Sequence, residues 1–190
     1  MNRLTTSRAT AALAAALLLL IGGCASKAPP YQASLDNLEL LKKAPRGMAV
    51  GSFSVAAGAT GATTISIRAA NMGSPVGADY AAYLAEALRQ ELVLAGKLDP
   101  RSSLEIGGVL LKNDIDAGGF STNTGELEAR FIVKNGGAQR YEKVHRASLI
   151  WDSSFAGAIA IPKAHQQYPL IVQKLLSQLL ADAEFQAAIR

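Results

Sequence analysis

The stretch 126–134 constrains the fold most, because apolar residues alternate with charged ones along it, with Ile132 as the one exception. The odd-numbered positions from 127 to 133 are Leu, Ala, Phe and Val, and charged side chains occupy most of the positions between them. This pattern is typical of a strand that buries one face. Asn135-Gly136 follows directly and is a strong hairpin signal. We therefore expect a strand, a tight turn and a second strand, packed on a core through one face.

The neighbouring segments extend this hairpin. Residues 103–115 have strand character, and Gly107-Gly108 within them permits a bulge. The second hairpin strand is expected from Arg140 to about Phe155 and contains the only tryptophan, Trp151. Together these segments predict a three-strand antiparallel meander over residues 103–155. The apolar connection 151–162 is expected to return into the core.

Upstream of the meander the sequence predicts one strand, a loop, a short strand and a helix. The strand covers 48–55, the loop covers 56–64, and the short strand covers 65–67. The helix begins after Asp79, a good N-cap, and ends at Gly96, with apolar residues at helical spacing between them.

Downstream, apolar residues recur at helical spacing from Tyr168 to Leu180. Pro169 either lies in the first turn of this helix or kinks a longer helix that begins near Lys163. The element order β-α-β-β-β-α predicts an α+β fold, with two amphipathic helices packed on one face of an antiparallel meander sheet. The other face of the sheet is then open to a partner or to solvent.

The first 24 residues have the layout of an export signal. Arg3 and Arg8 precede an apolar run from residue 9 to residue 21, and Gly22-Gly23 separates that run from Cys24. The run is shorter than the roughly 20 residues that span a bilayer, which favours a cleaved signal over a permanent membrane helix. Cys24 is the only cysteine, so it forms no internal disulfide and is a buried thiol, a reactive thiol, an intermolecular bridge or an anchor point.

The sequence Ile21-Gly22-Gly23-Cys24 resembles the lipobox of bacterial lipoproteins. The resemblance implies cleavage between Gly23 and Cys24, two acyl chains such as palmitate on the thiol, and usually a third on the new amino terminus. Two or more chains give stable membrane anchoring. Ala25 stands where an aspartate would favour the inner membrane, which implies the outer membrane, facing the periplasm. The alternative is an ordinary secretory signal cut near Gly23, which leaves a free thiol.

The expected organisation has three parts. Residues 1–23 form the lipoprotein signal peptide, residues 24–36 a lipidated N-terminus and flexible tether, and residues 37–190 a single periplasmic domain. Two of the 19 Lys and Arg residues lie in the signal, which leaves 17 of them against 15 Asp and Glu. This near-neutral balance gives no basis for nucleic-acid binding.

Catalytic and metal motifs are absent from the sequence. Only His145 and His165 could act as an imidazole base, and no Gly-x-Ser-x-Gly motif accompanies them. Asp114 and Asp116 begin like a calcium loop, but glycines occupy its fifth and twelfth positions. A glycine-rich hairpin loop is the better interpretation, and we expect no cofactor, no metal site and no enzymatic activity.

The element order also resembles several small envelope lipoproteins, among them a lipopolysaccharide-assembly lipoprotein and auxiliary lipoproteins of lipid-transport systems. The resemblance is architectural. It implies a non-enzymatic binding or adaptor domain in envelope assembly or transport. Its partners would be the outer membrane, through the acyl chains on Cys24, and another envelope protein. The alternative is an anchored periplasmic hydrolase that uses His145 or His165.

Overall fold

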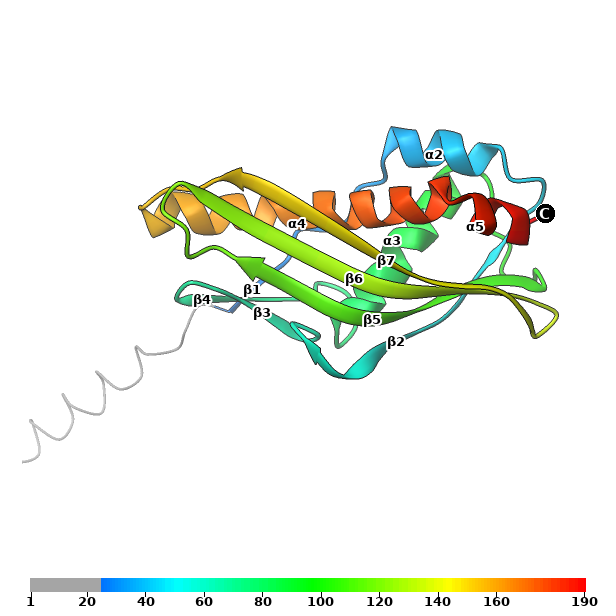
Figure 1. Cartoon of the computed structure of the whole chain (residues 1–190), viewed down its shortest axis with the longest axis horizontal. Coiled ribbons are helices and arrows are strands. Elements are labelled where there is room, and N and C mark those ends of the chain that lie inside the picture. The colour runs from blue at the N-terminus through cyan, green and yellow to red at the C-terminus, as the bar shows by residue number, and fades with distance from the viewer. Residues whose placement is uncertain (1–24) are drawn as a thin grey trace, which may run out of the picture.

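The computed structural model describes residues 25–190, which form two sheets and a layer of helices (Figure 1). The strands are β1 (Ala25–Lys27), β2 (Ala49–Thr60), β3 (Thr64–Ile67), β4 (Ala70–Gly73), β5 (Leu104–Asp116), β6 (Thr122–Asn135) and β7 (Ala138–Asp152). The helices are α2 (Leu35–Lys42), α3 (Tyr80–Leu94), α4 (Gly157–Ala181) and α5 (Ala183–Ala188). No helix within residues 25–190 is both long and apolar enough to cross a membrane.

The larger sheet contains the predicted meander. Its strand order is β2-β5-β6-β7, with β5, β6 and β7 antiparallel and β2 parallel to β5. Between β6 and β7 lie Gly136 and Gly137, with φ of 57° and 83°. Two successive residues with positive φ match the right-handed twist of the hairpin strands, and glycine adopts them without strain. The α+β class and the antiparallel meander are confirmed.

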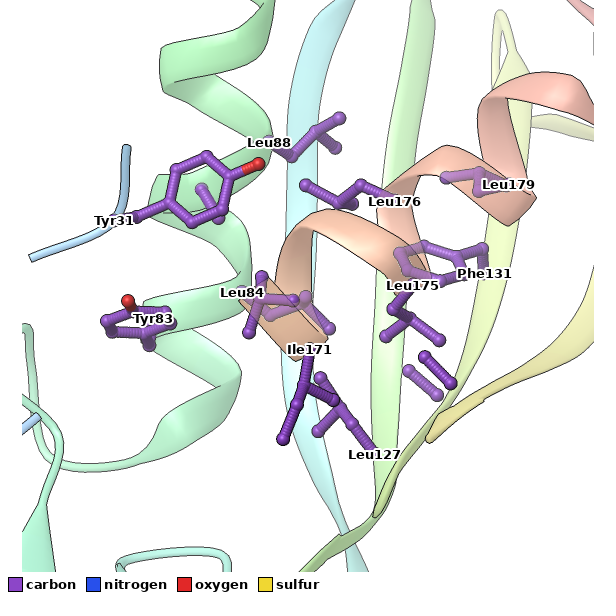
Figure 2. Packing of buried hydrophobic residues seen from close by; sticks show 14 of the residues in the cluster. Tyr31, Tyr83, Leu84, Leu88, Leu127, Phe131, Ile171, Leu175, Leu176 and Leu179 are labelled. Atoms are coloured by element: carbon purple, nitrogen blue, oxygen red, sulfur yellow. The ribbon is translucent and has the colours of Figure 1, made fainter. Parts of the chain in front are cut away.

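Both long helices lie on one face of this sheet. Helix α3 packs on β2 and β5, and α4 packs on β6 and β7 (Figure 1). Figure 2 shows the resulting core, in which Leu84 and Leu88 of α3 meet Leu175 and Leu176 of α4 above Phe131 of β6. The predicted arrangement of two amphipathic helices on one face is therefore present.

The boundaries of α3 follow from its local sequence. The Asp79 carboxylate accepts a hydrogen bond from the Ala82 amide at 2.9 Å, as expected of an N-cap. At the other end, Gly96 has a φ of 67°, which stops the helix. Glu91 of this helix is fully buried, although a carboxylate is rarely buried without partners.

Three segments differ from expectation. Strand β2 continues to Thr60 through the predicted loop, and α4 begins at Gly157, before both of its prolines. The connection from Trp151 to Pro162 was predicted to return into the core, but Phe155 and Ile159 within it are exposed. The apolar composition of this connection therefore reflects a surface feature.

The small sheet was mostly unforeseen. Its order is β1-β4-β3, with β1 parallel to β4 and β3 antiparallel to β4. Only β3 was expected from the sequence. Strands of three and four residues are too short to show an alternation that can be distinguished from a loop.

The predicted flexible tether over residues 24–36 is corrected by the structure from residue 25 onward. Strand β1 is paired, the Ala28 amide donates to the Gly73 carbonyl at 2.8 Å, and the Tyr31 side chain is buried. The polar and proline-containing composition concealed this packing, because the segment has no periodic apolar face.

Candidate functional site

Four segments gather at the end of the molecule where the described chain begins: β1, the β3–β4 turn, the β5–β6 loop and the β7–α4 connection (Figure 1). We call this region the proximal end. Ala25 is paired with Asn71 in β4, and Asn71 lies three residues after Arg68 in the β3–β4 turn. At about 3.3 Å per strand residue, Ala25 is on the order of 10 Å from Arg68.

Arg68 joins two loops of the proximal end. Its backbone has a φ of 54°, in the left-handed region that few non-glycine residues adopt. The guanidinium donates to the carbonyls of Ala117 at 2.7 Å, Ser154 at 2.7 Å and Phe155 at 3.0 Å. Ala117 belongs to the β5–β6 loop, and the other two belong to the β7–α4 connection. A single side chain therefore fixes both segments relative to the small sheet.

The two loops present an exposed aromatic pair. The Ser153 hydroxyl donates to the Gly119 carbonyl at 2.6 Å and adds a second link between them. Phe120 and Phe155 stack with ring centroids 5.9 Å apart and an interplanar angle of 10°, although they are 79% and 81% exposed. Ile159, in the first turn of α4, is 59% exposed. We call Phe120, Phe155 and Ile159 the apolar tip.

An open hollow of about 500 Å³ lies beside β1, lined by Ser26, Ala70, Ile161, Pro162, His165 and Gln166. At its edge the Ser26 hydroxyl is 3.2 Å from His165 Nε2 and donates to the Asn71 carbonyl at 3.2 Å. Burial lowers the pKa of His165, and a hydrogen bond with the Lys27 backbone opposes this shift. The hollow therefore combines apolar walls with one neutral polar pair.

The Ser26–His165 pair is incomplete as a catalytic unit. A serine and an imidazole within reach of each other satisfy the first requirement of nucleophilic catalysis. The second requirement is an orienting acid on the other imidazole nitrogen. The partners of this pair in the described part of the chain are the backbones of Asn71 and Lys27, and neither is a carboxylate.

His145 lies in a different place, on β7 beneath α5. Its Nε2 atom is 2.6 Å from the Tyr141 hydroxyl, and both side chains are buried. Burial lowers the pKa of His145, and the charge of Asp182 opposes this shift. The two histidines therefore do not form one site, and His145 has the packing of a core histidine.

Asp114 and Asp116, near the β5–β6 loop, have structural or solvent-exposed positions. Asp116 Oδ1 accepts a hydrogen bond from the Gly118 amide at 2.9 Å, and the Asp114 side chain on β5 is exposed. Across residues 25–190, no three His, Cys, Asp or Glu side chains are grouped so that they could hold a metal ion. The predicted lipidation and cleavage residues, Cys24 and Gly23, lie outside the described residues.

The face of the larger sheet opposite the helices carries paired charges. Lys112 Nζ is 2.5 Å from Glu126 Oε2, and Arg146 contacts both Glu126, at 3.1 Å, and Glu128. A hollow of about 230 Å³ lies beside Gly107, where the pairing of β2 with β5 is irregular. We call this surface the outer face.

A buried polar cluster holds the first ordered segment on the helices. Glu91 Oε1 accepts from the Tyr31 hydroxyl at 2.5 Å, the Ser34 amide at 3.0 Å and Asn37 Nδ2 at 3.0 Å. Burial raises the pKa of the Tyr31 phenol, and the bond to Glu91 adds to this shift. The only sequence signal for the cluster is a carboxylate close to the apolar stripe of α3.

Sequence reasoning missed Arg68 and the apolar tip. The arginine is 49 residues from its first carbonyl partner and 87 residues from the farthest. No local pattern marks such pairings. The signal that was available is the presence of phenylalanines in two loops, since apolar side chains that gather into an exposed patch mark an interaction surface.

No family model matches the chain, and no curated protein matches it. Among solved structures, it is similar to a Xanthomonas campestris protein of the DUF330 family model. The TM-score is 0.53 at 8% identity, covering 86% of this chain and 96% of that one. It also matches a provisionally named lipoprotein from Caulobacter crescentus with a TM-score of 0.43 at 12% identity, covering 81% of this chain and 95% of that one. The first likeness establishes the fold alone, and the second is too distant to carry an argument.

Proposed function

We propose that this chain is a lipid-anchored outer-membrane lipoprotein, whose non-enzymatic domain binds a partner on the periplasmic side in envelope assembly or transport. One observation carries the proposal. Ala25, the residue next to Cys24, is already paired into the domain as the first residue of β1. Acyl chains on Cys24 would therefore hold the folded domain directly at the membrane surface, with no intervening linker.

The outer face supports the adaptor role. The helices of residues 25–190 cover the opposite side of the sheet, so within the described part of the chain this face is free for a partner. Its charges are mixed and largely paired with one another, and Val144 lies exposed among them. Non-obligate protein interfaces are about as apolar as the rest of the protein surface, so this face needs no large apolar patch to bind a partner.

The anchored hydrolase is the second candidate, and the contact between Ser26 and His165 favours it. Against it stand the backbone partners of that pair, which leave the imidazole without an orienting acid. Replacing His145 and His165 together distinguishes the hydrolase from the adaptor. Unchanged folding and an unchanged cellular phenotype would exclude the hydrolase, whereas loss of function in a folded double variant would exclude the adaptor.

The anchor is tested by labelling cells with radioactive palmitate and separating their membranes. The wild-type chain should carry label and fractionate with the outer membrane. The Cys24→Ser variant should carry none and remain an uncleaved precursor. An unlabelled wild-type chain would contradict the proposal.

The partner is tested by site-specific photocrosslinking in intact cells. A photoreactive residue at Val144, on the outer face, should capture one envelope protein. The matched control is Leu35, which is exposed on α2 in the helix layer. Equal capture from both positions, or capture from Leu35 alone, would contradict the use of the outer face.

A further inference from the structure

We propose that the apolar tip inserts into the surface of the lipid bilayer beside the acyl chains, so that the proximal end of the domain rests on the membrane. The inference rests on the proposed anchor at Cys24. It goes further by assigning a second membrane contact and a fixed orientation to the folded domain.

The first step is the position of the tip relative to the anchor. Cys24 directly precedes Ala25, and Ala25 pairs with Asn71 beside the β3–β4 turn. From that turn, Arg68 donates to the carbonyl of Phe155 itself. The aromatic pair is therefore joined to the anchored end of the chain through a strand pairing and one side chain. Figure 1 shows these segments together at the end of the molecule opposite the C-terminus.

The second step is the chemistry of the tip. Two phenyl rings are exposed and stacked only on each other, with a third apolar side chain nearby on α4. Water solvates such a surface poorly, whereas the boundary between headgroups and acyl chains accommodates aromatic and aliphatic side chains. Lys27, exposed on β1, adds a positive charge that favours contact with lipid phosphates.

The third step is rigidity. Arg68 donates four hydrogen bonds from the small sheet to backbone carbonyls of the two loops, and Ser153 donates one that joins the loops to each other. The loops therefore present the phenylalanines in a fixed place and do not fold them back onto the domain. Because the anchor holds this end at the bilayer, a lipid surface is the occupant that the tip meets first.

The test uses the full acylated protein in vesicles of phosphatidylethanolamine and phosphatidylglycerol. With Cys24 acylated, a cysteine introduced as Ala156→Cys is the only free thiol and can carry a fluorophore next to Phe155. The matched control, Ala138→Cys, places the same fluorophore at the β6–β7 hairpin, at the opposite end of the sheet. Quencher groups on lipid acyl chains then report which label enters the bilayer.

The inference predicts strong quenching at position 156 and none at 138. In a Phe120→Ser/Phe155→Ser background the quenching at 156 should be lost, while the protein still floats with the vesicles. Circular dichroism of that variant verifies its fold, and Ile159→Ser provides an independent, smaller loss of quenching.

Two outcomes overturn the inference in different ways. If the label at 156 is not quenched in protein that floats with the vesicles, insertion of the tip is refuted and the proposed anchor is unaffected. Quenching at 156 that persists in the Phe120→Ser/Phe155→Ser variant refutes insertion of the tip in the same way. Protein that does not float refutes the proposed anchor, and the inference is lost with it.

Discussion

Tyr31 donates a hydrogen bond to the buried carboxylate of Glu91 at 2.5 Å, although the two residues are 60 positions apart in the chain. This bond fixes the segment that follows β1 onto the helix layer. The chain from Ala25 onward is therefore part of the folded domain, and the anchor proposed at Cys24 would determine which end of the domain faces the bilayer.

Tyr31→Phe should lower the free energy of unfolding by about 1–3 kcal/mol, because a buried carboxylate loses one of its three donors. Urea denaturation measures this change. Leu35→Ala is the control, since that side chain is 79% exposed and its loss should be nearly neutral. Equal stability of the Tyr31 variant and the wild type would contradict the role of this bond.

Arg68→Ala should loosen the proximal end, because it removes the donors that join the two loops. Hydrogen exchange should accelerate in residues 117–121 and 153–156 and remain unchanged in α3. Arg68→Gly should be about 1 kcal/mol more stable than Arg68→Ala, because glycine tolerates a φ of 54°. Unaltered exchange in both loops would show that the arginine does not organise them.

Gly125→Ala should destabilise the fold by about 1–3 kcal/mol through overpacking. A methyl group at this position in β6 would lie 2.3 Å from the Ile171 side chain and 3.2 Å from Trp151. Gly118→Ala is the matched control, because its methyl group would meet only the Asp116 carboxylate, at 3.3 Å. Thermal unfolding should give a lower melting temperature for Gly125→Ala than for Gly118→Ala. Similar melting temperatures would contradict the close packing of α4 on β6.

Stability should decrease in mild acid because of the two histidines. Burial lowers the pKa of both in the folded state below the ordinary value of 6.5. Their contribution is complete above that value and is lost as the pH falls toward the folded-state pKa, because the unfolded chain binds protons first. Between about pH 7 and pH 5 the loss should be smaller in His145→Gln than in the wild type. An identical pH profile would contradict the buried, neutral state of His145.

The sequence predicted the parts of the fold that depend on local pattern. The alternation over 126–134 and the cap at Asp79 determine a strand and a helix start through neighbouring residues, and both are present. The order of these elements was sufficient to predict the meander with both helices on one face.

The features that could not be predicted depend on contacts between distant residues. Strand β1 exists because β4 is there to pair with it, and the burial of Glu91 depends on donors more than 50 positions away. The segment 24–36 was expected to be flexible because its own composition carries no strong structural signal. The connection 151–162, which carries Phe155 and Ile159, was assigned to the core for a similar reason, because hydrophobicity alone does not reveal which side of a sheet a connection follows.

The proposal that Cys24 is the lipid anchor is tested by the mass of the amino-terminal peptide of the mature protein, isolated from membranes. The account predicts a peptide that begins at Cys24 and carries a diacylglyceryl group on sulfur, usually with a third acyl chain on the amino group. A mature chain that begins at an unmodified residue near Cys24, or one that retains residues 1–23, would contradict it.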